Sequence, residues 1–489
     1  MSPKRLLPLL LILFVLGALA FLLKRTPAPI QLADEVGLDS LVPKTMPADS
    51  ISGLDLYLGA KPQESVQLRK RDQTWVVASR FDTPSNSTKL QPLLTQLSTL
   101  QGELRADSTA LLGDFQLTDE QALHLKVYTD NPDKPAVHLL AGKGSAGKGF
   151  MRRNGEGKVY SVDLHLQSTA GLSGTATDQT LTAKPWLNLH LQDIPKEQIR
   201  AVELLAPARR LRFSTDPAAT APSWTLVAPE LPYSVKPEAV ESLVTSLRTI
   251  QADDVADPAQ LVAYGLDTPP YQAILTLQAS GEESRQVTLR LGNEVPDKQG
   301  SRYARLGEAG PVYVLPQWLS QRLFPTLGTL FTLRLLQVTE EEVTEVALHA
   351  EGTSWALIRQ AMDASASGTP AAPIWQVVDD PEVTVDTAAV TSLFAAAGQL
   401  DADDLPASPP TATGLDQSTA HVAFTWRDGR TARVLLGHAV DQDNHGYYAS
   451  RGHEGEVFVL TTITYKTLTE AITKLKPGST SADTVSTKP

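Results

Sequence analysis

The sequence predicts an α+β protein: an N-terminal transmembrane helix followed by three tandem copies of a unit made of a mostly antiparallel sheet plus a helix. Three observations lead to this prediction. The chain opens on an uncharged apolar run, one amphipathic helical pattern recurs three times at constant spacing, and short alternating strands ending at glycine follow each pattern. With 489 residues, 42% hydrophobic and 20% charged, the chain has the composition of several folded domains.

The apolar run Leu6–Leu23 contains no charged residue and is bracketed by two pairs of basic residues. Its length lies at the lower limit for a membrane-spanning helix. A cleaved signal peptide is the alternative, because Ala18-Leu19-Ala20 satisfies the small-x-small cleavage rule. The apolar run continues past Ala20, which favours an uncleaved anchor. We therefore expect a transmembrane anchor at 1–25 and a linker at 26–45.

The helical pattern has apolar residues at spacing i, i+3, i+4, i+7 and i+10, which is typical of an amphipathic helix. It starts at Leu90 and recurs 150 residues later at Val240, then again 150 residues later at Val390. Asn86 and Asp386 are suited to cap two of these helices, and Pro237 suits the first position of the other. Internal repetition of this kind predicts helices beginning near residues 87, 237 and 387.

Strand patterns flank each helix. A tryptophan precedes it in a short β-prone run, at Trp75, Trp224 and Trp375. After it come alternating apolar runs that end at Gly142, Gly292 and Gly437 and lead into aromatic-bearing hairpins. Each unit is therefore predicted as two strands, the tryptophan strand, one helix and a four-strand meander. The predicted copies span 46–191, 192–336 and 337–476, and a polar tail covers 477–489.

Composition excludes several classes of function. The formal net charge of −12 argues against nucleic-acid binding, which needs a concentrated basic face. The chain has no cysteine, which excludes disulfides, thiolate metal sites and cysteine nucleophiles.

Four features invite a chemical interpretation, and a structural interpretation is favoured for each. The glycine-rich segment Gly142–Gly149 lacks the hydroxyl that a phosphate-binding loop places after its lysine, so we expect a hairpin turn. The tryptophans could form a stacking row for glycan or peptide, but their fixed register favours packing against the helices. The other two features are a histidine group (His438, His445 and His453), whose spacing fits no zinc motif, and two acidic runs (253–254 and 401–404), which we expect to be solvated loops.

The segment Tyr264-Gly265-Leu266-Asp267 with Pro269, followed by a strand ending in Leu-Gly and a tyrosine-bearing hairpin, resembles the domain-of-unknown-function family numbered 4340. The third copy keeps Gly414-Leu415-Asp416, and the first departs with Phe115-Gln116-Leu117-Thr118. The resemblance implies a bacterial protein, single-pass in the cytoplasmic membrane, with repeats facing the periplasm or cell exterior. It also implies an association with ABC-type transport components similar to those of gliding motility.

The expected function is that of a membrane-tethered extracytoplasmic interaction module, accessory to an ABC-type transport or gliding-like envelope complex. Its expected partners are the membrane, through the N-terminal helix, and envelope or transporter proteins. We predict no catalytic residue, no metal ligand and no cofactor, and hence no enzyme. The alternative is an envelope hydrolase of glycan or peptide that uses acidic residues, which would need two carboxylates converging in one cleft.

Overall fold

The computed structural model describes residues 37–477 except 45, 146, 173–179, 208, 217–222, 279–282, 361–373, 384, 407–409, 411, 419, 442–445 and 453–455. The predicted anchor at 1–25 lies outside the described residues, and so do residues 478–489 of the predicted tail. Within the described ranges, no helix has both the length and the hydrophobicity that crossing a membrane requires. The chain divides into two compact units between Asn188 and Leu189.

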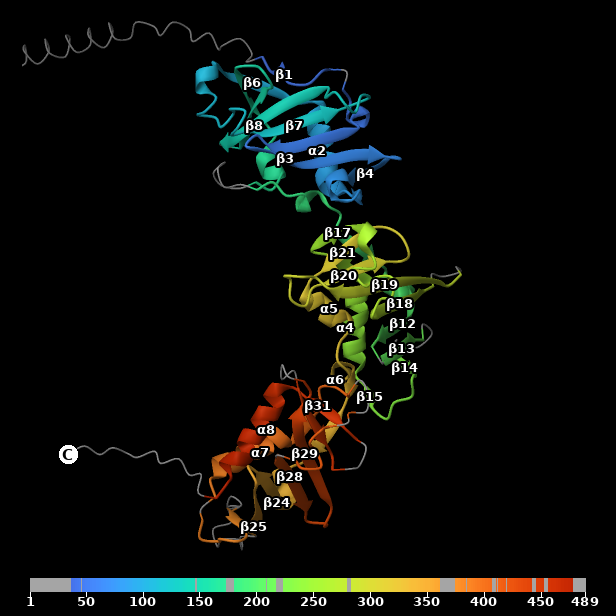
Figure 1. The fold of residues 1–489 in the computed structure, drawn as a ribbon, viewed down its shortest axis with the longest axis vertical. Helices are drawn as coiled ribbons and strands as arrows, with labels where there is room; N and C mark the ends of the chain where they lie inside the picture. Colours follow the sequence, from blue (N-terminus) through green and yellow to red (C-terminus); the bar gives the residue numbers. More distant parts are fainter. Residues whose placement is uncertain are drawn as a thin grey trace, which may run out of the picture. The chain divides into compact units, whose positions relative to one another are not determined.

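The first unit contains a ten-stranded antiparallel sheet, called the first sheet below (Figure 1). Its strands are β1 (Asp39–Ser40), β2 (Gly53–Leu58), β3 (Lys61–Arg71), β4 (Thr74–Val77), β5 (Thr83–Pro84), β6 (Gln101–Asp107), β7 (Leu123–Tyr128), β8 (Val137–Ser145), β9 (Lys148–Arg153) and β10 (Lys158–Val162). In the described part of this unit, the sheet is accompanied by the α-helices α2 (Ser87–Ser98) and α3 (Leu166–Thr169).

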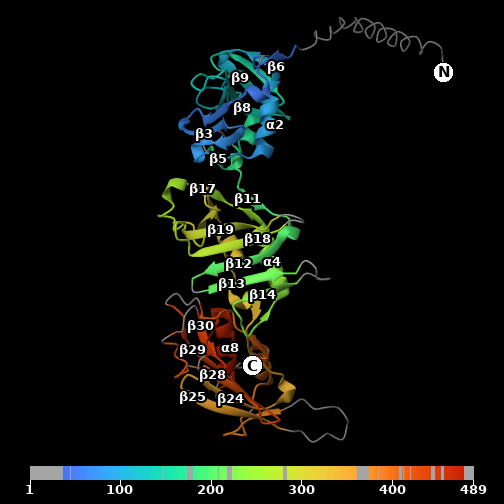
Figure 2. The same ribbon diagram turned by 90° about the vertical axis from the view of Figure 1, so that its right-hand side faces the viewer.

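The second unit contains two further large sheets (Figure 2). The second sheet is built from β12 (Ile199–Ala206), β13 (Arg209–Thr215), β14 (Trp224–Ala228), β17 (Asp254–Ala256), β18 (Tyr271–Leu277), β19 (Arg285–Glu294), β20 (Arg302–Leu306) and β21 (Val312–Leu315). The third sheet is built from β24 (Val343–Ala350), β25 (Thr353–Gln360), β26 (Ile374–Val377), β28 (Ala420–Trp426), β29 (Thr431–Ala439), β30 (Tyr447–Ser450) and β31 (Phe458–Leu460).

The three large sheets share one strand order. It reads β10-β9-β8-β7-β2-β3-β4 in the first, β21-β20-β19-β18-β12-β13-β14 in the second and β31-β30-β29-β28-β24-β25-β26 in the third. Neighbouring strands pair antiparallel throughout. The α+β class and the antiparallel pairing predicted from the sequence are thus confirmed. The copy boundaries at 191/192 and 336/337 stay predictions.

The repeated helices begin where the sequence places them. α2 starts at Ser87, α4 (Pro237–Arg248) at Pro237 and α7 (Thr387–Ala397) at Thr387. The side chains of Asn86 and Asp386 accept backbone N–H groups of the first turn, which satisfies donors that the helix itself leaves unpaired. The apolar face of α2, from Leu90 to Leu97, is buried, so hydrophobic burial holds the helix in place.

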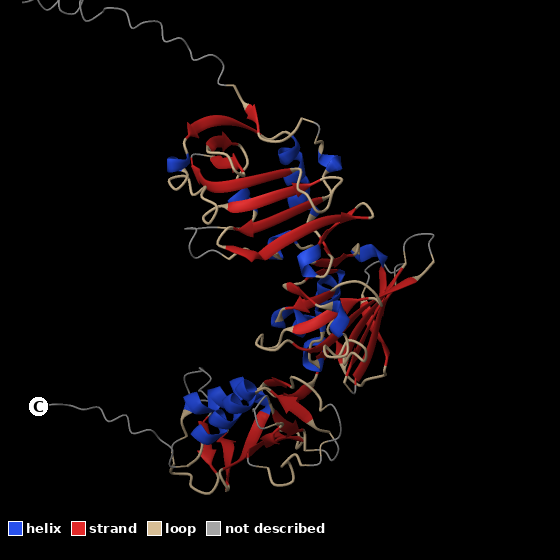
Figure 3. Cartoon of the chain, turned by 45° about the horizontal axis from the view of Figure 1, so that its top comes forward, coloured by secondary structure: helices blue, strands red, loops and turns tan. Residues whose placement is uncertain are grey.

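Each sheet is followed by a second helix that the sequence did not predict, located after the last meander strand. It is α3 in the first sheet, α5 (Gln317–Leu323) in the second and α8 (Thr462–Lys474) in the third. Figure 3 shows α7 and α8 together against the third sheet, and α4 contacts α5 in the second. The prediction of one helix per unit was therefore wrong. α3 and α5 are too short to show a helical period, and α8 is rich in threonine, which has low helix propensity.

Short strands complete the second unit at the start and end of each sheet. A lead-in strand precedes the second and third sheets and pairs with the strand that follows the main helix. The lead-in strands are β11 (His190–Asp193) and β23 (Arg334–Gln337), and their partners are β16 (Thr249–Gln251) and β27 (Gln399–Asp401). A further short pair is formed by β15 (Ser234–Val235) and β22 (Phe331–Thr332), and the short helix α6 (Leu327–Leu330) precedes β22. β11 pairs with β16 and β23 with β27, just as β1 pairs with β6 in the first sheet.

Candidate functional site

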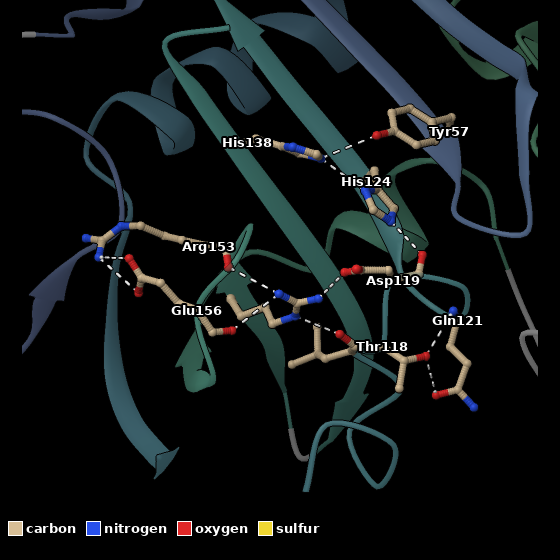
Figure 4. Close-up of polar contacts among 10 residues, drawn as sticks. Tyr57, Thr118, Asp119, Gln121, His124, His138, Arg153 and Glu156 are labelled. Atoms are coloured by element: carbon tan, nitrogen blue, oxygen red, sulfur yellow. Dashed lines mark hydrogen bonds and ion pairs between the residues drawn. The ribbon is translucent and has the colours of Figure 1, made fainter. Parts of the chain in front are cut away.

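A polar cluster lies on the face of the first sheet that is opposite its main core. Because side chains alternate across a strand, His124 on β7 points away from Leu123 and Leu125, and His138 on β8 points away from Leu139. Figure 4 shows the two imidazoles beside Tyr57 of β2. Nδ1 of His124 lies 3.0 Å from Nε2 of His138, and the Tyr57 ring stacks on that of His124 at 4.6 Å.

Burial favours the neutral form of both imidazoles. It lowers the pKa of His124, and it lowers that of His138 to about 4, with a smaller contribution from the neighbouring His124. Nε2 of His124 lies 2.7 Å from the carbonyl oxygen of Asp119, which can only accept, so this nitrogen carries the hydrogen. Nδ1 of the neutral ring then accepts, and Nε2 of His138 donates to it. The geometry thus fixes both tautomers and leaves a lone pair on Nδ1 of His138.

Arg152 of β9 continues the cluster beneath the segment 109–122. Its side chain is buried, donates from Nε to the carbonyl oxygen of Leu117 at 2.7 Å, and pairs with the carboxylate of Asp119. Leu117 packs with Leu140 in a small second core on this face of the sheet. The hydrogen bonds of Arg152 and His124 therefore hold the 109–122 segment against the sheet, which is a positioning role.

The third sheet carries a similar pair at the equivalent register. His349 on β24 faces His421 on β28, as Tyr57 faces His124, and the two rings stack at 5.0 Å. Nη2 of Arg433 donates to Nε2 of His421 at 3.3 Å, and burial lowers the pKa of His421 to about 4. In the second sheet, Leu205 and Gln272 stand in this register. No group of three or more histidines and acids able to hold a metal ion occurs in the described residues.

The family-like segments have a shared structural role in all three sheets. The glycine that ends the Leu-Gly strand packs against a carbonyl of that segment, and a Cβ would lie 2.1 Å from Phe115 O at Gly142 and 2.0 Å from Tyr264 O at Gly292. The third sheet repeats the contact, with a Cβ at Gly437 lying 2.2 Å from Thr413 O. The next residue donates its N–H to the same carbonyl in each case. These glycines are needed because no side chain fits at that approach.

The left-handed turn in the segment is also repeated. Gly265 and Gly414 have φ values of 64° and 68°, and Gln116 in the first sheet adopts 56° although it is not glycine. The departure of the first copy from the motif therefore changes the residue and keeps the backbone conformation. Only the glycines adopt this region without steric cost.

A cavity lies beside β19 in the second sheet, where the pairing with β20 shifts register between Leu291 and Glu294. We call it the bulge cavity. Its volume is about 740 Å³, and its wall includes residues of β18, β19, β20, α5 and the residue after α5: Tyr271, Glu294, Arg302, Gln317, Gln321 and Phe324. A β-bulge bends its strand and opens space next to it, which explains the position of the cavity.

The first sheet has a smaller cavity at the same place. β8 shifts register between Ala141 and Gly144, and a cavity of about 280 Å³ there is closed by the residues around α3. The third sheet shows the same shift between Leu436 and Ala439. There Tyr447 and Tyr465 stack at 3.7 Å, at the positions of Arg302 and Ser320. The bulge is thus repeated, while the space beside it differs from sheet to sheet.

The structure also shows where the other candidate residues from the sequence lie. Gly142–Gly149 forms the end of the β8–β9 hairpin, as expected, and Lys148 pairs with Asp163. Trp75, Trp224 and Trp375 are 8%, 6% and 5% exposed, which excludes a surface stacking row. His438 packs against Gly414, and His445 and His453 lie outside the described residues.

The interpretation of 401–404 as a solvated loop was wrong. Asp401 pairs with Arg334, Asp403 accepts the backbone N–H of Thr461, and Asp404 pairs with Arg209. These partners are between 58 and 195 residues away in sequence, so no local pattern could reveal them. Asp253 of the other acidic run lies 3.8 Å from Lys298.

Sequence reasoning missed the two histidine pairs and the bulge cavity. One sequence pattern did indicate the first histidine pair. In the LHLKVY run, alternation places the histidine on the opposite face of the strand from the two leucines. A register shift leaves no such signal, because it depends on how two strands pair.

The comparisons with known proteins agree with the repeated architecture. A family model described as "Domain of unknown function (DUF4340)" matches residues 75–269 and again residues 224–373, which together cover more than half of the chain. The two matches begin at Trp75 and Trp224, the equivalent tryptophans of β4 and β14. No match was found among curated proteins or among solved structures. The chain thus belongs to the DUF4340 family, and the resemblance noted in the Tyr264–Asp267 segment is confirmed.

Proposed function

We propose that this chain is a membrane-tethered extracytoplasmic interaction module that binds a ligand without turnover. The observation that carries the proposal is the bulge cavity. Its volume of about 740 Å³ falls in the range of small-molecule sites, and its wall combines charged, amide and aromatic groups. The same position in the first sheet has a cavity of about 280 Å³. Repeated units on one scaffold create extended surfaces that repeat proteins use for binding.

The tether is part of the proposal and rests on the apolar run Leu6–Leu23. An anchor confines the sheets near a partner and raises their effective concentration, so weak contacts suffice. The resemblance to families that accompany ABC-type transport components supports an accessory role in a transport or gliding-like envelope complex. This role and the extracytoplasmic location are parts of the same proposal.

The wall of the bulge cavity does not favour a carboxylate-based hydrolase. Glu294 is the only acid among the described residues that line it, and it already bonds Arg302. A glycoside hydrolase needs a second carboxylate across the substrate. Binding is therefore the function that this wall supports best.

A complementation assay in a deletion strain of the native host tests the proposal. Three forms are compared: the full chain, residues 30–489 released into the same compartment, and the full chain carrying Glu294→Gln with Arg302→Met. We expect activity from the full chain alone. Asp416→Asn, an exposed acid away from the cavity, is the matched control and should complement fully. Full activity from the released form would overturn the tether, and full activity from the double variant would overturn the cavity as the binding site.

A further inference from the structure

We infer that the bulge cavity binds a neutral saccharide, with the exposed indole of Trp318 as its stacking platform. This inference rests on the proposed binding function and goes further by naming the class of ligand. It is built from the charges of the wall, its free amide groups, the exposed tryptophan next to two wall residues on α5, and the contrast with the third sheet.

The charges of the wall are already neutralised. Nη2 of Arg302 donates to Glu294 Oε1 at 2.8 Å, and Nη1 donates to the carbonyl oxygen of Gly292 at 3.0 Å. The guanidinium also lies over the Tyr271 ring at 4.9 Å. Since the cation is paired and held in place, the wall offers little to attract a charged ligand.

The amide groups of the wall are available to a ligand. Gln299, Gln317 and Gln321 line the cavity, and in the described part of the chain their side chains make no hydrogen bond to another residue. Each amide offers two donors and an acceptor, and a sugar hydroxyl likewise both donates and accepts. Gly300 keeps this arrangement open, because a Cβ there would lie 2.5 Å from Gln317 Cγ.

Trp318 supplies the apolar surface that a saccharide requires. It is 59% exposed, follows Gln317 on α5 and lies one turn before Gln321, so that the indole and the Gln321 amide are neighbours on the helix. An indole is a large flat apolar surface, suited to the C–H face of a sugar ring. The two large aromatic rings of the wall itself, Tyr271 and Phe324, already contact each other at 5.2 Å.

The third sheet offers a matched control. Ile463 is the second residue of α8, as Trp318 is of α5, and it is 79% exposed. It lies two residues before Tyr465, whose ring stacks on Tyr447 at the position of the bulge cavity. Replacing Ile463 removes an exposed apolar side chain of the same helical position without touching the cavity.

The test is isothermal titration of the full chain in lauryldimethylamine oxide micelles, whose head group is not a sugar. The probes are a neutral tetrasaccharide of N-acetylglucosamine, an anionic tetrasaccharide of galacturonic acid and alanine tetrapeptide. We expect saturable binding of the neutral probe, weakened about tenfold by Trp318→Ala and by Gln321→Ala but less than about twofold by Ile463→Ala. All three substituted positions are exposed, and an unchanged far-UV circular dichroism spectrum confirms that the variants fold.

The outcomes separate this inference from the proposed function. Preference for the anionic probe or the peptide, with loss in Trp318→Ala, would overturn the saccharide and keep the cavity as a binding site. Binding of the neutral probe that neither Trp318→Ala nor Gln321→Ala weakens would overturn the site assignment. Absence of binding by any probe would overturn the inference. The proposed interaction module would still stand if the released form failed to complement in the complementation assay.

Discussion

Arg209 and Asp404 form an ion pair between residues 195 positions apart in the chain, with 2.8 Å between Nη2 and Oδ1. Arg209 begins β13 of the second sheet, and Asp404 forms an isolated antiparallel bridge with Val459 of β31, at the edge of the third sheet. The same carboxylate oxygen accepts the N–H groups of Leu327 and Leu405. An acidic residue that the sequence places in a loop thus connects the two sheets of the second unit.

Asp404→Asn should lower the free energy of unfolding of the second unit by about 1–2 kcal/mol, since it weakens an ion pair and two backbone contacts at a site 23% exposed. Thermal unfolding of the full chain followed by tryptophan fluorescence measures the change. Asp416→Asn is the control, because Asp416 is exposed. A double-mutant cycle with Arg209→Met should give a favourable coupling energy, and zero coupling would show that the pair contributes nothing.

Gly292→Ala should destabilise the second sheet by at least about 3 kcal/mol, because its Cβ would lie 2.0 Å from the carbonyl oxygen of Tyr264 and backbone cannot move aside cheaply. Gly113→Ala, where a Cβ meets nothing within 4 Å, is the control and should leave stability nearly unchanged. Circular dichroism melts compare the two. Equal melting temperatures would contradict the close approach that the structure shows.

Trp224→Ala should cost about 3–5 kcal/mol of stability, since the indole is 6% exposed. Its Nε1 donates to Glu241 of α4 at 3.1 Å, so the burial expected from the sequence is confirmed and the helix supplies a polar partner as well. Trp224→Phe should recover most of the loss, leaving about 1 kcal/mol for the missing hydrogen bond. Chemical denaturation of the variants decides this, and no recovery with phenylalanine would point to the hydrogen bond as the main contribution.

The first sheet should lose stability as the pH falls from about 6.5 toward about 4. The pKa of His138 is lowered from 6.5 to about 4 by burial, so between these values the unfolded chain binds a proton that the folded chain does not. The stabilisation is complete above pH 6.5 and declines as the pH falls. His138→Gln should flatten the dependence of melting temperature on pH for the first unit. His421→Gln, whose histidine has the same pKa of about 4, should do so for the third sheet.

Local chemistry determined much of the fold. The apolar spacing from Leu90 to Leu97 and its recurrence at 240 and 390 identify three helices, because a 3.6-residue period survives in any helix that buries one face. The capping residues Asn86 and Asp386 mark the helix starts by satisfying nearby N–H groups. Alternation predicted the strands, and the glycine-ended strands predicted the turns. The repeat made these assignments secure, since the same pattern had to hold three times.

Only the tertiary structure decided what surrounds these elements. The partner of Asp404, the carbonyl packed on Gly292 and the fixed tautomers of His124 and His138 all depend on residues distant in sequence. The register shift at Leu291 opens a cavity whose wall includes residues of α5. Because α5 has only seven residues, its sequence is too short to show a helical period. Sequence patterns report which face a side chain takes relative to its own strand or helix. Which strand lies opposite, and in which register, is set by packing over the whole sheet.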